Sequence, residues 1–141
     1  MAAFFPLISE ILAMIMPACT QIVRASDVQQ SDAVGQPTAV PAVVNACDKM
    51  CASVLTLPPK TATAVRQNSE QDAIVFVVAG AAELLVHNSD KDEAARHSLG
   101  PEHRAENQSD LEARWAIFQG GPRPIGAELE DWGGDEITPE K

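Results

Sequence analysis

The chain has 141 residues, of which 45% are hydrophobic, and 20 acidic residues against 10 basic ones give it a net charge of −10. This length suits one domain with a buried core, and the hydrophobic share is too high for a fully disordered protein. The acidic balance argues against nucleic acid and anionic membranes as partners, because both are bound through clustered Lys and Arg.

Residues 1–39 are predicted to be an N-terminal extension and linker. Residues 1–16 are largely apolar, but this stretch is too short and too interrupted for a transmembrane helix. No Lys or Arg precedes Arg24, whereas a secretion signal begins with basic residues. We therefore expect a cytoplasmic protein, either with a helix over residues 7–16 or with Met16 as its native start. Residues 26–38 are polar and aperiodic, which predicts a loop.

The three cysteines do not form a metal-binding or redox motif. Three residues separate Cys47 from Cys51, whereas zinc and redox motifs place two residues between their cysteines. Cys19 stands far from both. We interpret the three as small, buried, free thiols of a protein in a reducing compartment.

From Val40 onward, short strand-like runs alternate with turn residues. The run at 61–65 alternates like a half-buried strand, and the apolar run at 74–78 predicts a strand buried on both faces. Gly80 follows this run and predicts a hairpin turn at positive φ. The predicted strands are residues 52–57, 61–66, 73–78, 83–87, 96–99 and 114–119. This spacing predicts a mainly β fold, an antiparallel sandwich or barrel.

The chain is thus divided into the extension 1–39, a β-domain over residues 40–124 and an acidic C-terminal tail over residues 125–141. Trp132 lies within this acidic tail. A single large aromatic residue in such a tail is predicted to dock on the surface of its own domain.

Five segments resemble the small single-domain cupins of fungal type, which have the RmlC-like jelly-roll fold. RQNSEQDAIVFVVAG (66–80) resembles the first cupin motif, and LGPEHRAEN (99–107) resembles the end of the second. WAIFQGGPRP (115–124) with LEDWG (129–133), and IVRASD (22–27), are similar to the ends of these proteins. The resemblance implies a jelly-roll barrel, often dimeric, that holds a divalent metal (Fe, Mn, Ni, Cu or Zn) with three His and one Glu.

The sequence departs from this pattern at the metal ligands. Arg66 and Asn68 stand where the first two histidines would be, and only His103 remains clearly of the ligand set. Arg is always protonated and cannot bind a metal ion, so no metal cofactor is expected. In addition, about ten residues with a strand are missing between Pro101 and Glu102 by comparison with the family. The chain must re-pair its strands, leave an open barrel edge, or fold badly as a shortened variant.

The resemblance places five polar residues toward the barrel interior as pocket candidates: Arg66, Gln67, Asn68, His103 and Asn107. Arg66 would suit a carboxylate or phenolate ligand. We interpret the chain as a cupin-type domain that binds a small molecule without the usual metal, and the resemblance implies a homodimer. The alternatives are a cupin enzyme of secondary metabolism, an isomerase, decarboxylase or dioxygenase using His103, and a non-functional shortened isoform.

Overall fold

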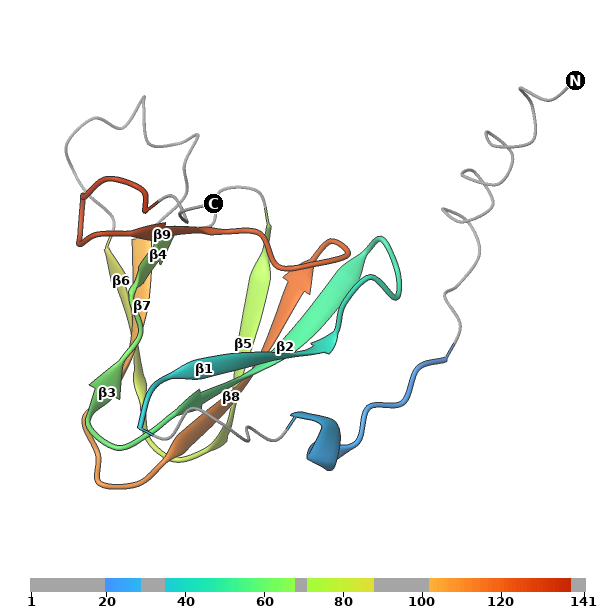
Figure 1. Cartoon of the computed structure of the whole chain (residues 1–141), viewed down its shortest axis with the longest axis horizontal. Coiled ribbons are helices and arrows are strands. Elements are labelled where there is room, and N and C mark those ends of the chain that lie inside the picture. The colour runs from blue at the N-terminus through green and yellow to red at the C-terminus, as the bar shows by residue number, and fades with distance from the viewer. Residues whose placement is uncertain (1–19, 29–34, 68–70, 88–101, 138–141) are drawn as a thin grey trace, which may run out of the picture.

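The computed structural model describes residues 20–28, 35–67, 71–87 and 102–137. Two antiparallel β-sheets face each other (Figure 1). The mainly β, antiparallel fold predicted from the sequence is therefore confirmed. A 3-10 helix at Ala25–Val28 precedes the strands. The described residues contain no helix long and apolar enough to cross a lipid bilayer.

Sheet A has four strands in the order β1-β2-β8-β5. Their bounds are Thr38–Val43 (β1), Met50–Leu57 (β2), Ala113–Gly120 (β8) and Ala73–Ala79 (β5). The second sheet, sheet B, is built around β7 (Glu102–Asn107), which pairs with β6 (Glu83–His87) along one edge. Short strands β3 (Thr61–Ala62) and β4 (Val65–Gln67) pair with the other edge of β7, and β9 (Ala127–Leu129) pairs with β4.

The core lies between the two sheets and is small. Leu55 pairs with Trp115, and Leu57 pairs with Ala113, so that these four side chains point from sheet A to the same side. Ala105 of β7 meets them from sheet B and completes the buried cluster. Side chains along a strand alternate between its two faces. A residue that lies an even number of positions from a cluster residue on the same strand is therefore assigned to the inner face.

Most predicted strands are present. The structure has β2, β5, β6 and β8 at the predicted places, and it divides the predicted strand at 61–66 into β3 and β4. The predicted strand at 96–99 and the predicted helix at 7–16 lie outside the described residues. Strands β1, β7 and β9 were not among the predicted runs, and β9 lies within the segment predicted as the acidic tail.

The prediction that residues 74–78 are buried on both faces is wrong. All seven residues of β5 are exposed, and its five large apolar side chains are between 37% and 70% accessible. The reason is the position of β5 at the end of sheet A, where β8 is its partner strand in the described chain. A continuous apolar run therefore marks an edge strand here rather than a central one.

The turn after β5 is confirmed, but the predicted hairpin is not. Gly80 has a φ of 81°, as the turn requires. However, β5 belongs to sheet A and β6 belongs to sheet B, so the turn crosses between sheets instead of joining paired neighbours. Leu84 and Val86 of β6 are also largely exposed. Within the described residues, the barrel therefore takes the open-edged form, one of the outcomes predicted from the shortened second motif.

The C-terminal segment folds back on the outer face of sheet B. Leu129 of β9 is buried opposite Val65 of β4. The guanidinium of Arg104 lies 6.0 Å from the centroid of the Trp132 ring, within the range of a cation–π contact. The backbone N–H of Gly133 donates to Glu102 Oε2 at 2.8 Å. The prediction that Trp132 docks on its own domain is confirmed.

Candidate functional site

The candidate site is a row of four side chains across sheet B. Arg66 and His103 are direct partners in the pairing of β4 with β7. Glu128 of β9 stands opposite Arg66, and Val86 of β6 stands opposite His103. Opposite residues of antiparallel strands point to one face, and His103 shares its face with Ala105 of the core. The row, which we call the β4–β7 row, therefore lies on the inner face of sheet B.

Arg66 supplies a positive charge to this row that is only weakly neutralised. Its Nη2 lies 3.7 Å from Glu128 Oε2, and the two side chains are 58% and 44% exposed. An ion pair this accessible to water is worth little, so another anion can displace Glu128 from the guanidinium. His103, which is half-buried, borders Arg66 on one side and the apolar Val86 on the other. The row thus combines a cation, an imidazole and an apolar side chain.

The structure separates the other predicted pocket residues from Arg66 and His103. Gln67 stands opposite Glu102, and alternation along β4 turns it to the outer face. Asn68 lies outside the described residues. Asn107 shares a face with His103 but lies at the other end of β7, opposite Thr61. Of the predicted set, Arg66 and His103 are therefore the pair that the structure brings together.

Asn107 is used by the fold itself. Its side chain is 1% exposed, and Nδ2 donates to the carbonyl oxygens of Leu57, Pro58 and Leu111 at 2.9, 3.2 and 2.8 Å. Its Oδ1 accepts from both the backbone N–H and the hydroxyl of Ser109, at 3.1 and 2.7 Å. A fully bonded buried amide holds two loops together, and it has little left to offer a ligand.

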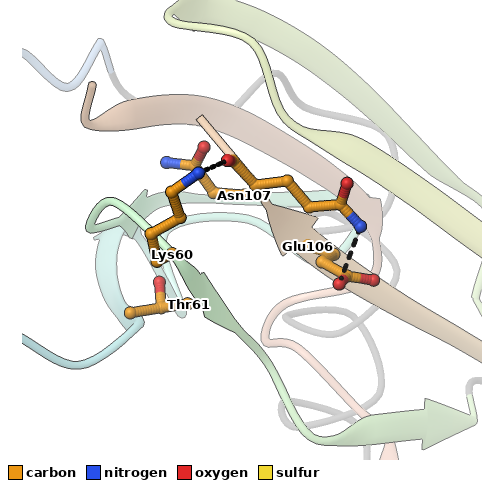
Figure 2. A pocket seen from close by; sticks show the side chains of 5 residues that line it. Lys60, Thr61, Glu106 and Asn107 are labelled. Atoms are coloured by element: carbon orange, nitrogen blue, oxygen red, sulfur yellow. Dashed lines mark hydrogen bonds between the residues drawn. The ribbon is translucent and has the colours of Figure 1, made fainter. Parts of the chain in front are cut away.

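A shallow, open pocket lies at this end of β7 (Figure 2). It is lined by Lys60, Thr61, Glu106, Asn107 and Gln108. The Lys60 ammonium donates to the backbone oxygen of Gln108, and Gln108 Nε2 donates to Glu106 Oε1 at 3.1 Å. These polar groups of the pocket therefore already bond one another.

The thiols described are those of Cys47 and Cys51, and both are free. Cys51 is buried on the inner face of β2, and burial raises the pKa of its thiol. Cys47 is half-buried, and its Sγ donates to the carbonyl oxygen of Met50 at 3.4 Å. Cys19 lies outside the described residues.

The β4–β7 row does not fit the divalent metal that a cupin resemblance implies. A metal site of the 3-His-1-Glu type needs several imidazole and carboxylate donors that converge on one point. Here His103 is flanked by a guanidinium and an isopropyl side chain, neither of which is a ligand. No group of three or more His, Cys, Asp or Glu that could hold a metal ion occurs within the part of the chain that the structure describes.

Comparison by sequence finds no relative. No family model matches the chain, and no curated protein matches it. The similarity of this chain to known proteins is therefore described at the level of the fold.

Comparison by structure finds the same fold in solved proteins. An uncharacterised conserved protein with a double-stranded β-helix domain from Klebsiella pneumoniae is 15% identical, with a TM-score of 0.58 over 79% of this chain and 99% of that one. TT1209 from Thermus thermophilus is 16% identical, with a TM-score of 0.55 over 74% of this chain and all of that one. The DMSP lyase DddQ from Ruegeria pomeroyi is 16% identical, with a TM-score of 0.50 over 79% of this chain and 60% of that one.

The fold is therefore a double-stranded β-helix. Sheets A and B are its two layers, and the β4–β7 row occupies the inner face of one layer. At these levels of identity the likeness shows the fold alone.

Proposed function

We propose that this chain is a cupin-type binding domain for a small organic anion, a carboxylate or phenolate, which it binds at the β4–β7 row without a metal ion. The observation that carries the proposal is the direct register of Arg66 with His103 on the inner face of sheet B. In a chain with a net charge of −10, the guanidinium of Arg66 offers a local positive charge to one anionic group.

Three features support this ligand class. Arg66 presents a planar fork of donors that matches a carboxylate, and its present partner is a weak surface contact. The imidazole of His103 can donate or accept a hydrogen bond beside it. Val86 next to His103, and Val75 and Val77 on the inner face of the opposite sheet, offer apolar surface for the body of the ligand.

The proposal contains no metal-dependent step, because the donors around His103 do not match those of a metal-binding cupin. Every role is assigned to side chains of this chain. Arg66 would bind the anionic group, and His103 would orient it. Val86 would contact the apolar part of the ligand.

The test compares benzoate with benzamide, which has the same shape but no charge, by isothermal titration calorimetry on the full chain. Benzoate is expected to bind, and benzamide is expected to bind at least tenfold more weakly. Arg66→Met should abolish the difference between the two probes. Arg114→Met is the matched control, because Arg114 is another half-exposed arginine paired to a glutamate, on sheet A.

Equal binding of benzoate and benzamide, or unchanged benzoate binding by Arg66→Met, would refute the proposal. His103→Ala is expected to weaken benzoate binding without removing the preference for charge. Elemental mass spectrometry of the purified protein is the second measurement. Stoichiometric Fe, Mn, Ni, Cu or Zn would overturn the metal-free assignment.

A further inference from the structure

The outer face of sheet A, the side turned away from the core, carries a continuous patch of apolar side chains. The pairing of β8 with β2 and with β5 sets six of them in two rows: Ala52, Phe118 and Ile74, then Val54, Ala116 and Phe76. Opposite residues of paired strands point to one face, and these six alternate along the strands with residues that face the core. We call the six the outer patch.

The β5 side of the outer patch is open to water within the described residues. Ile74 is 70% exposed, Phe76 is 63% exposed and Phe118 is 45% exposed. Toward the other edge of the sheet both rows continue into β1, because Val43 stands opposite Ala52 and Val40 stands opposite Val54. Large contiguous apolar surface is rare on proteins in water unless another segment or molecule covers it.

Among the stretches of chain outside the described residues, residues 1–19 have the composition to cover the outer patch. Most of their side chains up to Met16 are large and apolar, and Glu10 is their single charged side chain. Residues 88–101, in contrast, contain five charged residues and one large apolar side chain, Leu99. The short stretches 29–34, 68–70 and 138–141 are mainly polar.

The helix predicted over residues 7–16 has one apolar side. The residues that share this side at helical spacing are Leu7, Ile8, Ile11, Leu12 and Ile15. Ser9, Glu10 and Ala13 fall on the other side. A helix of ten residues is about 15 Å long, which is close to the roughly 14 Å between the first and last of four strands. The predicted helix therefore matches the outer patch in size as well as in polarity.

The described chain begins beside sheet A, which brings residues 7–16 within reach of the outer patch. The 3-10 helix at Ala25–Val28 packs against β1. Residues 17–24 link it to the predicted helix, and eight extended residues reach as far as about 26 Å. This reach exceeds the width of the sheet, so the linker can place the predicted helix over the far side of sheet A.

We propose that residues 7–16 fold as an amphipathic helix that packs its apolar side on the outer patch of the same chain. The helix then replaces water over Ile74, Phe76 and Phe118. Arg114 borders the outer patch on β8 and offers a positive charge to Glu10, the one acidic residue of the segment. The contact lies on the outer face of sheet A, so it is independent of the ligand that the β4–β7 row binds.

Hydroxyl-radical footprinting of the full chain tests the contact, because it measures how accessible individual Phe side chains are to water. Ile11→Asp sets a charge in the middle of the apolar side of the helix. Oxidation of Phe76 and Phe118 should become faster by about threefold or more, because the helix no longer shields them. Ala13→Asp is the matched control, since it adds the same charge on the other side of the helix and should leave both rates unchanged.

The reciprocal substitution changes the sheet and is read out on the segment. Phe118→Asp should speed hydrogen exchange of the amides of residues 7–16 by about tenfold or more, because an undocked short helix opens readily. Ile125→Asp is the matched control, because Ile125 is 44% exposed but lies between β8 and β9, outside the outer patch. Thermal unfolding followed by circular dichroism verifies that both sheets persist in each variant.

Three results would overturn the proposal. Equal oxidation of Phe76 and Phe118 in Ile11→Asp and in the unchanged chain would show that residues 7–16 do not cover the outer patch. Equal effects of Ile11→Asp and Ala13→Asp would indicate a general effect of charge instead of a docked apolar side. Protection that increases with protein concentration would assign the outer patch to a second copy, whereas docking within one chain is independent of concentration.

Discussion

Arg66 and His103 face each other across the pairing of β4 with β7, next to the pair formed by Gln67 and Glu102. The arrangement depends on two separate pieces of chain. Ala105 is fixed in the core, which turns His103 to the inner face, and the register then turns Arg66 to the same side. A slip of one residue would move Arg66 to the outer face. The site is thus set by the register of a strand only three residues long.

The first prediction concerns Glu128, which competes with an anionic ligand for Arg66. Glu128→Gln removes the negative charge 3.7 Å from the guanidinium. The free energy of unfolding should change by less than about 1 kcal/mol, because the pair is exposed. Benzoate affinity should rise by up to about fivefold, the equivalent of the same energy. Calorimetry and urea unfolding measure the two effects.

Glu112→Gln is the control for this substitution. Glu112 Oε1 pairs with Arg114 Nη2 at 3.5 Å, and its side chain is exposed to a similar degree, but the pair lies on sheet A. It should change neither benzoate affinity nor stability measurably. An equal rise in affinity in both variants would indicate a general effect of net charge and would contradict a specific role for Arg66.

The second prediction concerns the buried amide of Asn107. Asn107→Ala removes the amide donor to the carbonyls of Leu57, Pro58 and Leu111, of which that of Leu111 still accepts from the Ser109 hydroxyl. The expected loss is about 3 kcal/mol in the free energy of unfolding, from several lost bonds and unsatisfied groups. Ser109→Ala removes one hydroxyl from the same network and should cost about 1 kcal/mol.

Urea unfolding followed by Trp fluorescence compares the two variants, with the slope of the transition as a check on two-state behaviour. Similar losses in both variants would show that the hydroxyl of Ser109, rather than the amide, holds the loops. A benzoate affinity that falls in Asn107→Ala while the fold persists would return Asn107 to the ligand site.

The class of fold could be predicted from the sequence, because the signals that indicate it come from residues close together in the chain. Period-two alternation and turn residues depend on neighbouring positions, so β2, β6, β8 and the turn at Gly80 could be predicted from them. The order and spacing of segments that resemble cupin motifs implied a jelly-roll barrel, and solved structures confirm this fold. The docking of Trp132 followed from the cost of exposing a large aromatic side chain.

What failed depended on partners distant in sequence. An apolar run such as 74–78 has the same local pattern whether a strand has two neighbours or one, and the position of β5 at an edge is set by the whole sheet. β9 was missed because its three residues owe their strand form to pairing with β4. Glu128 was therefore assigned to a tail, although it lies beside Arg66. The hydrogen bonds of Asn107, which was predicted as a pocket residue, could not be foreseen, because alternation along a strand gives the face of a residue but not its bonding partners.

The third prediction concerns the turn that carries the chain from sheet A to sheet B. A Cβ at Gly80 would lie 2.5 Å from the backbone oxygen of Glu112 and 2.7 Å from Ala113 Cα, and the φ of 81° is strained for any other residue. Because both neighbours are backbone atoms of the β8 region, they cannot move aside without disturbing sheet A. Gly80→Ala should therefore cost more than about 3 kcal/mol, which is a large effect for one methyl group.

Gly35→Ala separates the effect of backbone strain at positive φ from that of a steric clash of the new Cβ atom. Gly35 also has a positive φ, of 86°, but nothing lies within 4 Å of its Cβ position. This variant should lose only about 1 kcal/mol, from the backbone conformation alone. The two melting temperatures, measured under one condition, test the difference. Equal losses would mean that the close approach of the turn to β8 contributes nothing.

The fourth prediction concerns stability at alkaline pH. Burial raises the pKa of the Cys51 thiol above its ordinary value of 9.0. The unfolded chain then loses this proton at a lower pH than the folded one, so between the two pKa values the folded state binds more protons. Stability from this group is complete below pH 9.0 and falls as the pH rises toward the folded pKa.

Cys51→Ala should flatten this alkaline decline, because the titrating thiol is gone. Cys47→Ala is the control, since Cys47 is less buried and lies outside the strand. The measurement is the free energy of unfolding by urea from pH 8 upward, under reducing conditions so that disulfide exchange does not contribute. Cys51→Ala also removes a buried sulfur and lowers stability at every pH, so the slope with pH, and not the absolute value, carries the test. A thiol that stays protonated in the folded state must contribute to the loss of stability at alkaline pH. An unchanged slope in Cys51→Ala would therefore contradict the prediction and assign the loss to other groups.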